Sequence, residues 1–271
     1  MEITLLGTGA ADGWPNPFCR CASCSWAREA AVVRTPTCLL VDGRLLLDAG
    51  PALPQQAVAA GVDLAGVRTA VVTHAHTDHL DPAFLLHRGW VRDDPLTVAG
   101  PRPVMDACHD WLDPASTVVT LAELTAGDDV VLDGYRVTAL PARHEALGEC
   151  LLYALEDADG ASVLYATDTG PGWLEEASGL LEGRRFDAVF CEETFGDADL
   201  SPQHLTLPTF AAEIGRLRAL GCVDDATRVV AVHLSHHNPP GPELAARLAR
   251  SGATAPPEGT RLRIAPAART P

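Results

Sequence analysis

The 271-residue chain contains no lysine: all 20 of its basic residues are arginine, against 36 aspartates and glutamates. This absence excludes lysine Schiff-base catalysis and the phosphate-binding lysine of nucleotide-hydrolysing loops. The formal net charge of −16 also disfavours long nucleic acids as partners, because polynucleotide binding depends on many cationic contacts with phosphates. Individual arginines remain able to hold a single phosphate.

Long apolar runs are also lacking. No stretch approaches the roughly 20 apolar residues that span a bilayer, and the chain begins Met1-Glu2-Ile3-Thr4 without a basic targeting segment. We therefore expect a soluble, cytoplasmic protein that does not associate with membranes. Proline and glycine (21 and 23 residues) are spread evenly, which favours one domain over residues 1–271, with a frayed tail from about residue 260.

The chain does contain a dense cluster of metal-binding side chains. The run Thr73-His74-Ala75-His76-Thr77-Asp78-His79 follows the apolar stretch 68–72 and places three imidazoles and a carboxylate within six residues. Neutral imidazole nitrogens and carboxylate oxygens are suitable ligands for zinc, manganese or iron. So dense a group, directly after a predicted strand, indicates a metal site rather than part of a hydrophobic core.

Three later apolar runs of strand length each lead to another ligand-type residue. In chain order these residues are His144, Asp168 and His233. Either histidine alone could be a surface residue, but two of them at strand ends favour a metal site.

The remaining pattern predicts a mixture of hairpins and strand-helix units. Asp-Gly pairs at 42–43 and 133–134 separate apolar segments and predict β-hairpins. Helices are expected at 54–60, 103–112, 172–182, 206–219 and 242–250, with strands at 187–191 and 228–232. Two hairpin-rich halves, each followed by alternating strands and helices, suit a mixed sandwich better than an all-parallel sheet.

The HxHxDH pattern after a strand, followed by His, Asp and His at later strand ends, resembles the signature of the metallo-β-lactamase superfamily. The resemblance covers residues from about 3 to 237. It implies an α/β (α+β) fold, a four-layered αβ/βα sandwich of a single domain, in a family whose members are mostly two-metal hydrolases.

The resemblance also implies an active site with two divalent cations, Mn²⁺ or Zn²⁺. One ion would be held by His74, His76 and His144, the other by Asp78, His79 and His233, and Asp168 would bridge them. A metal-bridging hydroxide would be the attacking group. Members that open lactams or thioesters often replace some of these ligands, so the full set of five histidines and two aspartates favours phosphodiester hydrolysis.

Asp78, as a ligand, and His204, as a general acid, are the predicted catalytic residues. His204 lies between Asp168 and His233 in the sequence, where phosphodiesterases of this superfamily usually carry a histidine that is not a ligand. An imidazole titrates near neutral pH and would protonate the leaving alkoxide or hold a phosphate oxygen. The alternative is a surface histidine at a helix start. Glu192 and Glu193 are expected to orient His204 or the ligands.

A second metal site is predicted in the loop 19–24. Cys19, Cys21 and Cys24 form a C-x-C-x2-C cluster, and tetrahedral zinc would need a fourth ligand. In the cyclic phosphodiesterases that this chain resembles, the second histidine of an HxxH pair completes a structural Zn²⁺ site. That residue would be His236 here, with His237 as the alternative.

Together these motifs resemble the phosphoribosyl 1,2-cyclic phosphate phosphodiesterases. The resemblance implies a metal-dependent phosphodiesterase acting on a small, cyclic phosphate ester such as a ribose 1,2-cyclic phosphate or a cyclic nucleotide. Three alternatives stay open. The first is a tRNA 3′-processing endoribonuclease; these enzymes share the metal ligands but use a basic arm that is not seen here. The second is a pyrroloquinoline quinone biosynthesis B protein; these proteins share a cysteine-rich site but have an incomplete HxHxDH set. The third is a metal-binding sensor, which would lack turnover. Relatives often form dimers, so a homodimer is a further expectation.

Overall fold

The protein is described by a computed structural model over residues 1–112, 118–145 and 148–266. The strands of its first sheet are β1 (Glu2–Gly7), β2 (Cys38–Val41), β3 (Leu45–Leu47), β4 (Thr69–Val71), β5 (Leu96–Gly100), β6 (Val119–Glu123) and β14 (Arg261–Arg263). Those of the second sheet are β7 (Asp129–Leu132), β8 (Tyr135–Pro141), β9 (Leu151–Glu156), β10 (Ser162–Ala166), β11 (Ala188–Glu192), β12 (Arg228–Val232) and β13 (Ala253–Thr254). The helices are α1 (Ala22–Glu29), α2 (Leu53–Ala59), α3 (Ala83–Gly89), α4 (Arg102–His109), α5 (Leu174–Leu181), α6 (Leu207–Ala219) and α7 (Gly241–Ala249).

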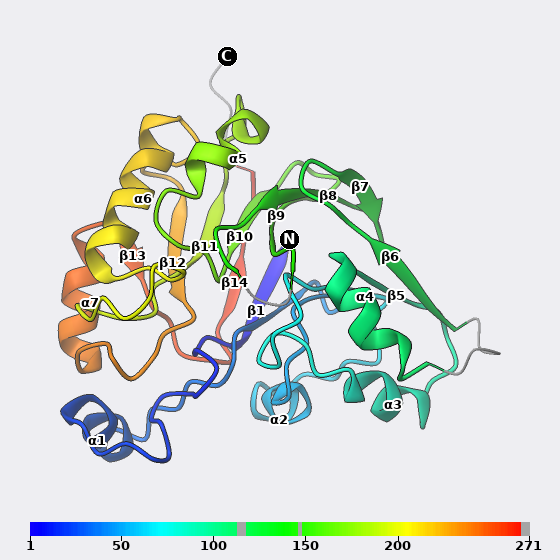
Figure 1. The fold of residues 1–271 in the computed structure, drawn as a ribbon, viewed down its shortest axis with the longest axis horizontal. Helices are drawn as coiled ribbons and strands as arrows, with labels where there is room; N and C mark the ends of the chain where they lie inside the picture. The colour runs from blue at the N-terminus through cyan, green and yellow to red at the C-terminus, as the bar shows by residue number, and fades with distance from the viewer. Residues whose placement is uncertain (113–117, 146–147, 267–271) are drawn as a thin grey trace.

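The two seven-stranded sheets pack together, with helices on the outer side of each (Figure 1). The strand order is β14-β1-β2-β3-β4-β5-β6 in the first sheet and β13-β12-β11-β10-β9-β8-β7 in the second. Each sheet has an antiparallel part built from hairpins and a parallel part built from strand-helix units. The predicted four-layered αβ/βα sandwich is therefore confirmed.

Both predicted hairpins are present. β2 pairs with β3 and β7 with β8, each antiparallel. The turn residues Asp42, Gly43, Asp133 and Gly134 all have positive φ, between 47° and 88°. This backbone conformation matches the twist of the flanking strands, and Asp-Gly pairs adopt it readily.

Three hydrophobic clusters fill the three interfaces between the four layers. Neighbouring residues of one strand serve different interfaces: Leu5 and Leu39 lie in the cluster between the sheets, whereas Leu6 and Leu40 lie in the cluster that contains residues of α2, α3 and α4. The third cluster joins the second sheet to α5, α6 and α7. Because successive side chains point to opposite faces, strands buried on both faces read as continuous apolar runs.

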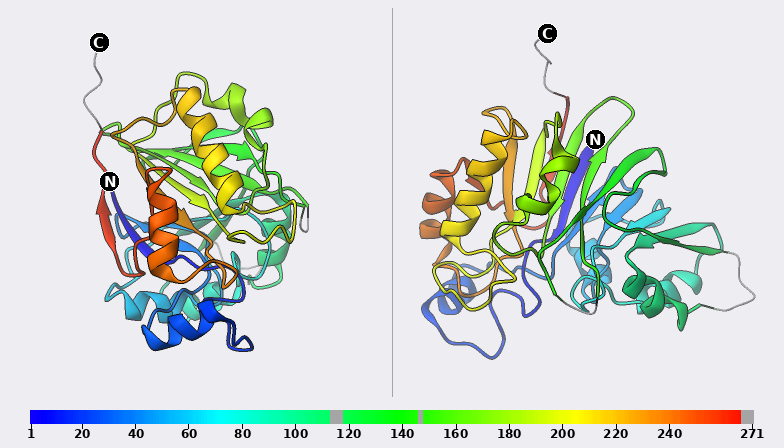
Figure 2. Two further views of the ribbon diagram at one scale, coloured as in Figure 1. Left: turned by 90° about the vertical axis from the view of Figure 1, so that its left-hand side faces the viewer. Right: turned by 45° about the horizontal axis from the view of Figure 1, so that its top comes forward.

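Two sequence-based expectations about segments are corrected. The tail expected from about residue 260 is wrong for Arg261–Arg263, because these residues form β14 and pair with the otherwise open edge of β1 (Figure 2). Residues 267–271 of that expected tail lie outside the described residues. The expected zinc-binding loop 19–24 is a loop only up to Cys21, since α1 begins at Ala22 and contains Cys24.

None of the helices in the described part of the chain is both long enough and apolar enough to cross a membrane.

Candidate metal centre

The predicted ligands of the active site gather at the carboxyl ends of strands from both sheets. The loop after β4 carries the HxHxDH residues, and loops after β8, β10 and β12 supply one side chain each. Two clusters have donor atoms within 4.8 Å of one another: one contains His74, His76, His144 and Asp168, and the other contains Asp78, His79, Asp168 and His233. The structure thus brings all seven predicted ligands together, and Asp168 belongs to both clusters.

Asp168 lies between the two clusters. Its Oδ2 atom is 3.5 Å from His74 Nε2, 3.3 Å from His79 Nε2 and 3.6 Å from His144 Nε2. Its Oδ1 atom is 3.1 Å from His233 Nε2. Asp168 therefore lies near histidines of both clusters, as a carboxylate shared between two ions would.

The backbone is strained where it delivers these groups. Asp168 and His233 each have a φ of 56°, and Asp48 has a φ of 65°. Left-handed backbone is uncommon for residues other than glycine, and it persists only where the surrounding structure enforces it. All three residues directly follow or nearly follow a buried strand, so the turn redirects their side chains into the site.

Four of the histidines are held in the tautomer that presents Nε2 to the site. The Thr73 hydroxyl donates to Asp48 and the Thr194 hydroxyl to Glu192, so each hydroxyl oxygen is left to accept a hydrogen from a histidine Nδ1. Such outer hydrogen bonds fix the orientation and tautomer of metal-ligating imidazoles. The Nδ1 partners are Thr73 Oγ1 for His74 (3.0 Å), Asp48 Oδ2 for His79 (2.8 Å), the Gln203 carbonyl for His144 (3.3 Å) and Thr194 Oγ1 for His233 (3.0 Å).

Asp48 is a further residue of the site that the sequence analysis did not single out. Its buried carboxylate accepts from His79 Nδ1, from the Thr73 amide (2.8 Å) and from the Tyr165 hydroxyl (2.8 Å). It therefore connects a residue of the HxHxDH loop to strands of both sheets. The available signal was its position directly after β3, at the same edge of the sheet as the HxHxDH loop.

The pKa values of the site residues depend strongly on the charges of their neighbours. Burial alone would raise the pKa of Asp168, but His233 and His79 hold it well below its ordinary value. Burial opposes protonation of His79, yet the carboxylates of Asp168, Asp78 and Asp48 raise its pKa well above the ordinary value. The site is thus built to compensate concentrated negative charge with positive charge.

His204 lies beside the ligands and is held by Glu192, as expected. Its Nδ1 is 3.2 Å from both carboxylate oxygens of Glu192. Its ring stacks on that of His233 (5.4 Å, 6° between planes) and meets His144 edge-on (4.9 Å). Burial opposes protonation, but Glu192 raises the pKa of His204 to about 9. Glu193 instead accepts a hydrogen bond from the Gly196 amide.

The predicted cysteine site also assembles. The donor atoms of Cys19, Cys21, Cys24 and His236 lie within 4.8 Å of one another, and Cys21 Sγ is 3.8 Å from His236 Nδ1. Ligands of a tetrahedral zinc are separated by roughly 3.3–3.8 Å. Burial opposes ionisation of Cys21, but hydrogen bonds from the Cys24 amide and His236 lower its pKa to about 6. Of the two histidines left open, the structure places His236 in this cluster.

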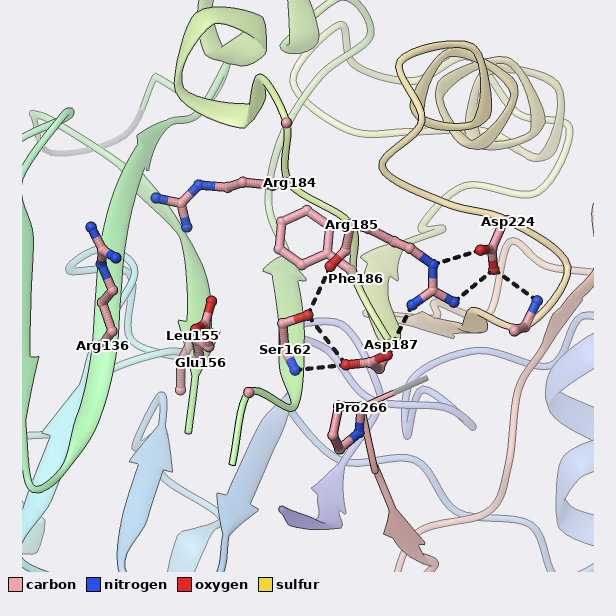
Figure 3. A pocket seen from close by; sticks show the side chains of 13 residues that line it. Arg136, Leu155, Glu156, Ser162, Arg184, Arg185, Phe186, Asp187, Asp224 and Pro266 are labelled. Carbon is pink, nitrogen blue, oxygen red and sulfur yellow. Dashed lines mark hydrogen bonds and ion pairs between the residues drawn. The ribbon is translucent and has the colours of Figure 1, made fainter. Parts of the chain in front are cut away.

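A cavity of about 820 Å³ lies at the other end of the second sheet (Figure 3). It opens beside Ser162 and Asp187 at the amino ends of β10 and β11, whereas Asp168 follows the carboxyl end of β10. A strand of five residues is roughly 16 Å long. The Arg185 guanidinium in this cavity donates to both Asp187 and Asp224. The cavity is therefore separate from the metal centre, and the charge of Arg185 is compensated within it.

Known proteins resemble this chain in sequence and in fold. Ribonuclease Z of Mycobacterium bovis (strain BCG / Pasteur 1173P2) is 28% identical over 193 residues, which are 63% of this chain and 64% of that protein. The chain thus matches less than two thirds of the length of that relative.

Two solved structures share the fold over nearly the whole chain. Zinc-bound PqqB from Methylobacterium extorquens has a TM-score of 0.75 at 22% identity, and the match covers 97% of this chain and 100% of that chain. A diphosphatase from the PhnP family has a TM-score of 0.72 at 22% identity, with 96% of each chain covered. Residues 43–234, most of the sequence, match the family described as Beta-lactamase superfamily domain. The chain therefore belongs to the β-lactamase superfamily, and its two helix-covered sheets are the metallo-β-lactamase sandwich of that family.

Proposed function

We propose that this protein is a metal-dependent phosphodiesterase that hydrolyses a small, cyclic phosphate ester. One observation carries the proposal. Six ligand-type groups surround Asp168 and complete a set of seven with it, and a histidine outside that set, His204, lies directly beside it with its own carboxylate partner, Glu192. Phosphodiester hydrolysis needs both parts: compensation of phosphoryl charge and a proton for the leaving oxygen.

The donor groups fit two divalent cations. His79 Nε2 is buried and lies 3.1 Å from Asp78 Oδ2 and 3.3 Å from Asp168 Oδ2, yet its geometry forms no hydrogen bond among the described residues, while Nδ1 of the same ring is held by Asp48. A buried lone pair without a donor is suited to a metal ion. Two bound cations, Mn²⁺ or Zn²⁺, would activate a water molecule and neutralise the phosphoryl oxygens. The residues that would hold them are His74, His76 and His144 for one ion, Asp78, His79 and His233 for the other, and Asp168 for both.

His204 would act on the substrate itself. Glu192 accepts from Nδ1, which leaves Nε2 as the atom that can reach a substrate oxygen. The Glu192 carboxylate raises the pKa of the imidazole, which favours its protonated form near neutral pH. His204 can therefore hold a phosphate oxygen and give its Nε2 proton to the departing alkoxide.

The charge of the chain supports a small substrate. With −16 overall and no lysine, the protein lacks the dispersed cations that make polynucleotide binding strong. The similarity to Ribonuclease Z favours a second candidate, an endoribonuclease acting on precursor tRNA. A biosynthetic or metal-binding role without phosphodiester turnover is the third, in view of the fold shared with PqqB.

A hydrolysis screen tests the proposal. Purified protein, loaded separately with Mn²⁺ and Zn²⁺, is assayed on ribose cyclic phosphates, 2′,3′-cyclic nucleotides, a nitrophenyl phosphodiester, a precursor tRNA and a β-lactam, with Asp168→Ala as the inactive control. We expect kcat/KM to be highest for a cyclic phosphate. Efficient cleavage of precursor tRNA would favour the endoribonuclease, and the absence of turnover on every ester would refute the phosphodiesterase.

A further inference from the structure

The loop after β11, which carries His204, and the loop after β12, which carries His233 and His236, are braced against each other. Residues 233–238 contain the ligand His233 and the cysteine partner His236. The Ser235 hydroxyl donates to the Thr194 carbonyl, and the Asn238 side-chain amide donates to the same carbonyl (3.2 Å). Residues 194–196 follow β11, so this brace fixes the distance between the β11 and β12 loops.

Gly196 makes the close approach possible. A Cβ atom at this position would lie 2.7 Å from the His237 carbonyl oxygen and 3.1 Å from Asn238 Cα, and its φ is 57°. Only glycine combines this backbone angle with that proximity. Phe195, the residue before it, is thereby brought between the two loops.

Aromatic rings connect the two sites across this contact. The His236 ring lies 4.3 Å from that of His237. His237 meets Phe195 edge-on at 5.7 Å (77°), and Phe195 meets His204 edge-on at 5.4 Å (79°). His204 in turn stacks on His233. A continuous series of ring contacts therefore runs from the cysteine cluster to the histidine beside the metal centre.

The polar contacts of His204 leave its orientation incompletely fixed. Glu192 meets Nδ1 with both oxygens at 3.2 Å, which holds that atom but permits the ring to tilt. Phe195 meets the ring edge-on (79°) whereas His233 stacks parallel to it (6°), and edge-to-face contacts have a preferred geometry. The half-buried Phe195 ring is thus placed to restrict the tilt.

We infer that Phe195 is a positioning residue for His204, and that His237 transmits the order of the cysteine cluster to it. This inference rests on the proposed function for its kinetic consequence. An ordered cluster holds residues 233–238, the His237 ring supports Phe195, and Phe195 keeps His204 Nε2 directed at the leaving oxygen. Loss of any member of the series should impair proton donation while leaving the metal centre assembled.

The kinetic test separates proton donation from general damage. Phe195→Ala and Phe195→Tyr are compared with Leu200→Ala, an exposed apolar residue of the same loop, on a ribose cyclic phosphate and on a nitrophenyl phosphodiester. We expect Phe195→Ala to lower kcat on the cyclic phosphate by about tenfold to a hundredfold, with KM and the nitrophenyl reaction changed by less than about threefold. Phe195→Tyr keeps the ring and should resemble the parent. Equal losses on both substrates would overturn the inference.

A second readout does not depend on turnover. The imidazole nitrogens of His204, assigned by comparison with His204→Ala, are followed by ¹⁵N NMR in protein with and without the cysteine-bound metal. Removing that metal, by Cys21→Ser, should shift the His204 signals in the parent and much less in Phe195→Ala. Unchanged His204 signals in the parent background would refute the coupling, even if no phosphate ester proves to be a substrate.

Discussion

The two ends of the second sheet manage charge in opposite ways. At the carboxyl ends of its strands, Asp168 and His233 have strained backbones, and the buried Nε2 of His79, 3.3 Å from Asp168 Oδ2, makes no hydrogen bond among the described residues. At the amino ends, Arg185 is bound by Asp187 and Asp224, and Asp187 also accepts from the Ser162 amide. Groups arranged to bind a ligand retain backbone strain and atoms without hydrogen bonds, whereas groups arranged for stability form hydrogen bonds and ion pairs with one another. Substitutions at the two ends should therefore have different consequences.

The largest effect is expected for Asp168→Ala. Both clusters share this carboxylate, so its loss should lower turnover by at least about a thousandfold and remove most of the exchangeable metal. Turnover and elemental analysis measure these changes, and circular dichroism should show an intact fold. Asp224→Ala is the matched control at the opposite end and should leave turnover unchanged. Near-normal hydrolysis by Asp168→Ala would refute the role of a shared carboxylate.

A loss that depends on the substrate is expected for His204→Ala. A general acid contributes about 10²- to 10⁴-fold when the leaving alkoxide is poor and little when the leaving group is an activated phenolate. The variant should therefore lose most activity on a sugar cyclic phosphate and retain much of it on a nitrophenyl diester. Parallel losses on both substrates would assign His204 to substrate binding instead.

Cys21→Ser should affect stability and metal content together. A closed site of three cysteines and one histidine would hold zinc as part of the fold, so the parent should contain one chelator-resistant zinc and up to two exchangeable metals per chain. Loss of the resistant zinc should lower the free energy of unfolding by at least about 3 kcal/mol, which corresponds to a decrease of roughly 10 °C in melting temperature for a chain of this size. Arg20→Ser, an exposed change in the same loop, is the control. Retention of the resistant zinc in Cys21→Ser would exclude the cysteine site.

A smaller effect is expected for Asp48→Asn. The amide can turn an N–H group towards His79 Nδ1, which favours the wrong tautomer for binding through Nε2. Changes of this kind typically weaken metal affinity by about 10- to 100-fold. Competition with a fluorescent chelator measures the affinity, and Asp42→Asn, at an exposed hairpin turn, serves as the control. An unchanged affinity would show that Asp48 is purely structural.

The smallest effect is expected for Asp224→Asn, which weakens the pairing with Arg185. The hydrogen bond from Arg185 lowers the pKa of Asp224 below its ordinary value. A lowered pKa contributes stability that is fully present above the pKa of the unfolded chain, about 4, and that declines below this pH until the pH has fallen through the pKa of the folded state. Since Asp224 is half exposed, the difference in unfolding free energy should be about 0.5 kcal/mol at pH 7 and smaller at pH 3. Denaturant titrations at both pH values check this, and a constant difference would contradict it.

Much of the site could be predicted because its chemistry is local in sequence. The HxHxDH residues occupy one loop, the three cysteines lie within six residues, and the later ligands each follow an apolar strand. Hairpins were predictable for the same reason, since Asp42-Gly43 and Asp133-Gly134 favour positive φ by themselves. The mixed sandwich followed from the order of these local patterns, and its four-layered form followed from the resemblance to the superfamily.

The remaining features depend on contacts between segments distant in the chain. Arg261–Arg263 form a strand only because β1 offers an open edge more than 250 residues earlier. Asp48 serves His79 only because β3 and β4 are neighbours, and the choice of His236 over His237 depends on how the loop after β12 meets α1. Residue types and spacing determined which chemistry this protein can perform. The packing of the two sheets decided which side chains support that chemistry, because hydrogen bonds and ring contacts form only between groups that the fold brings within a few ångströms.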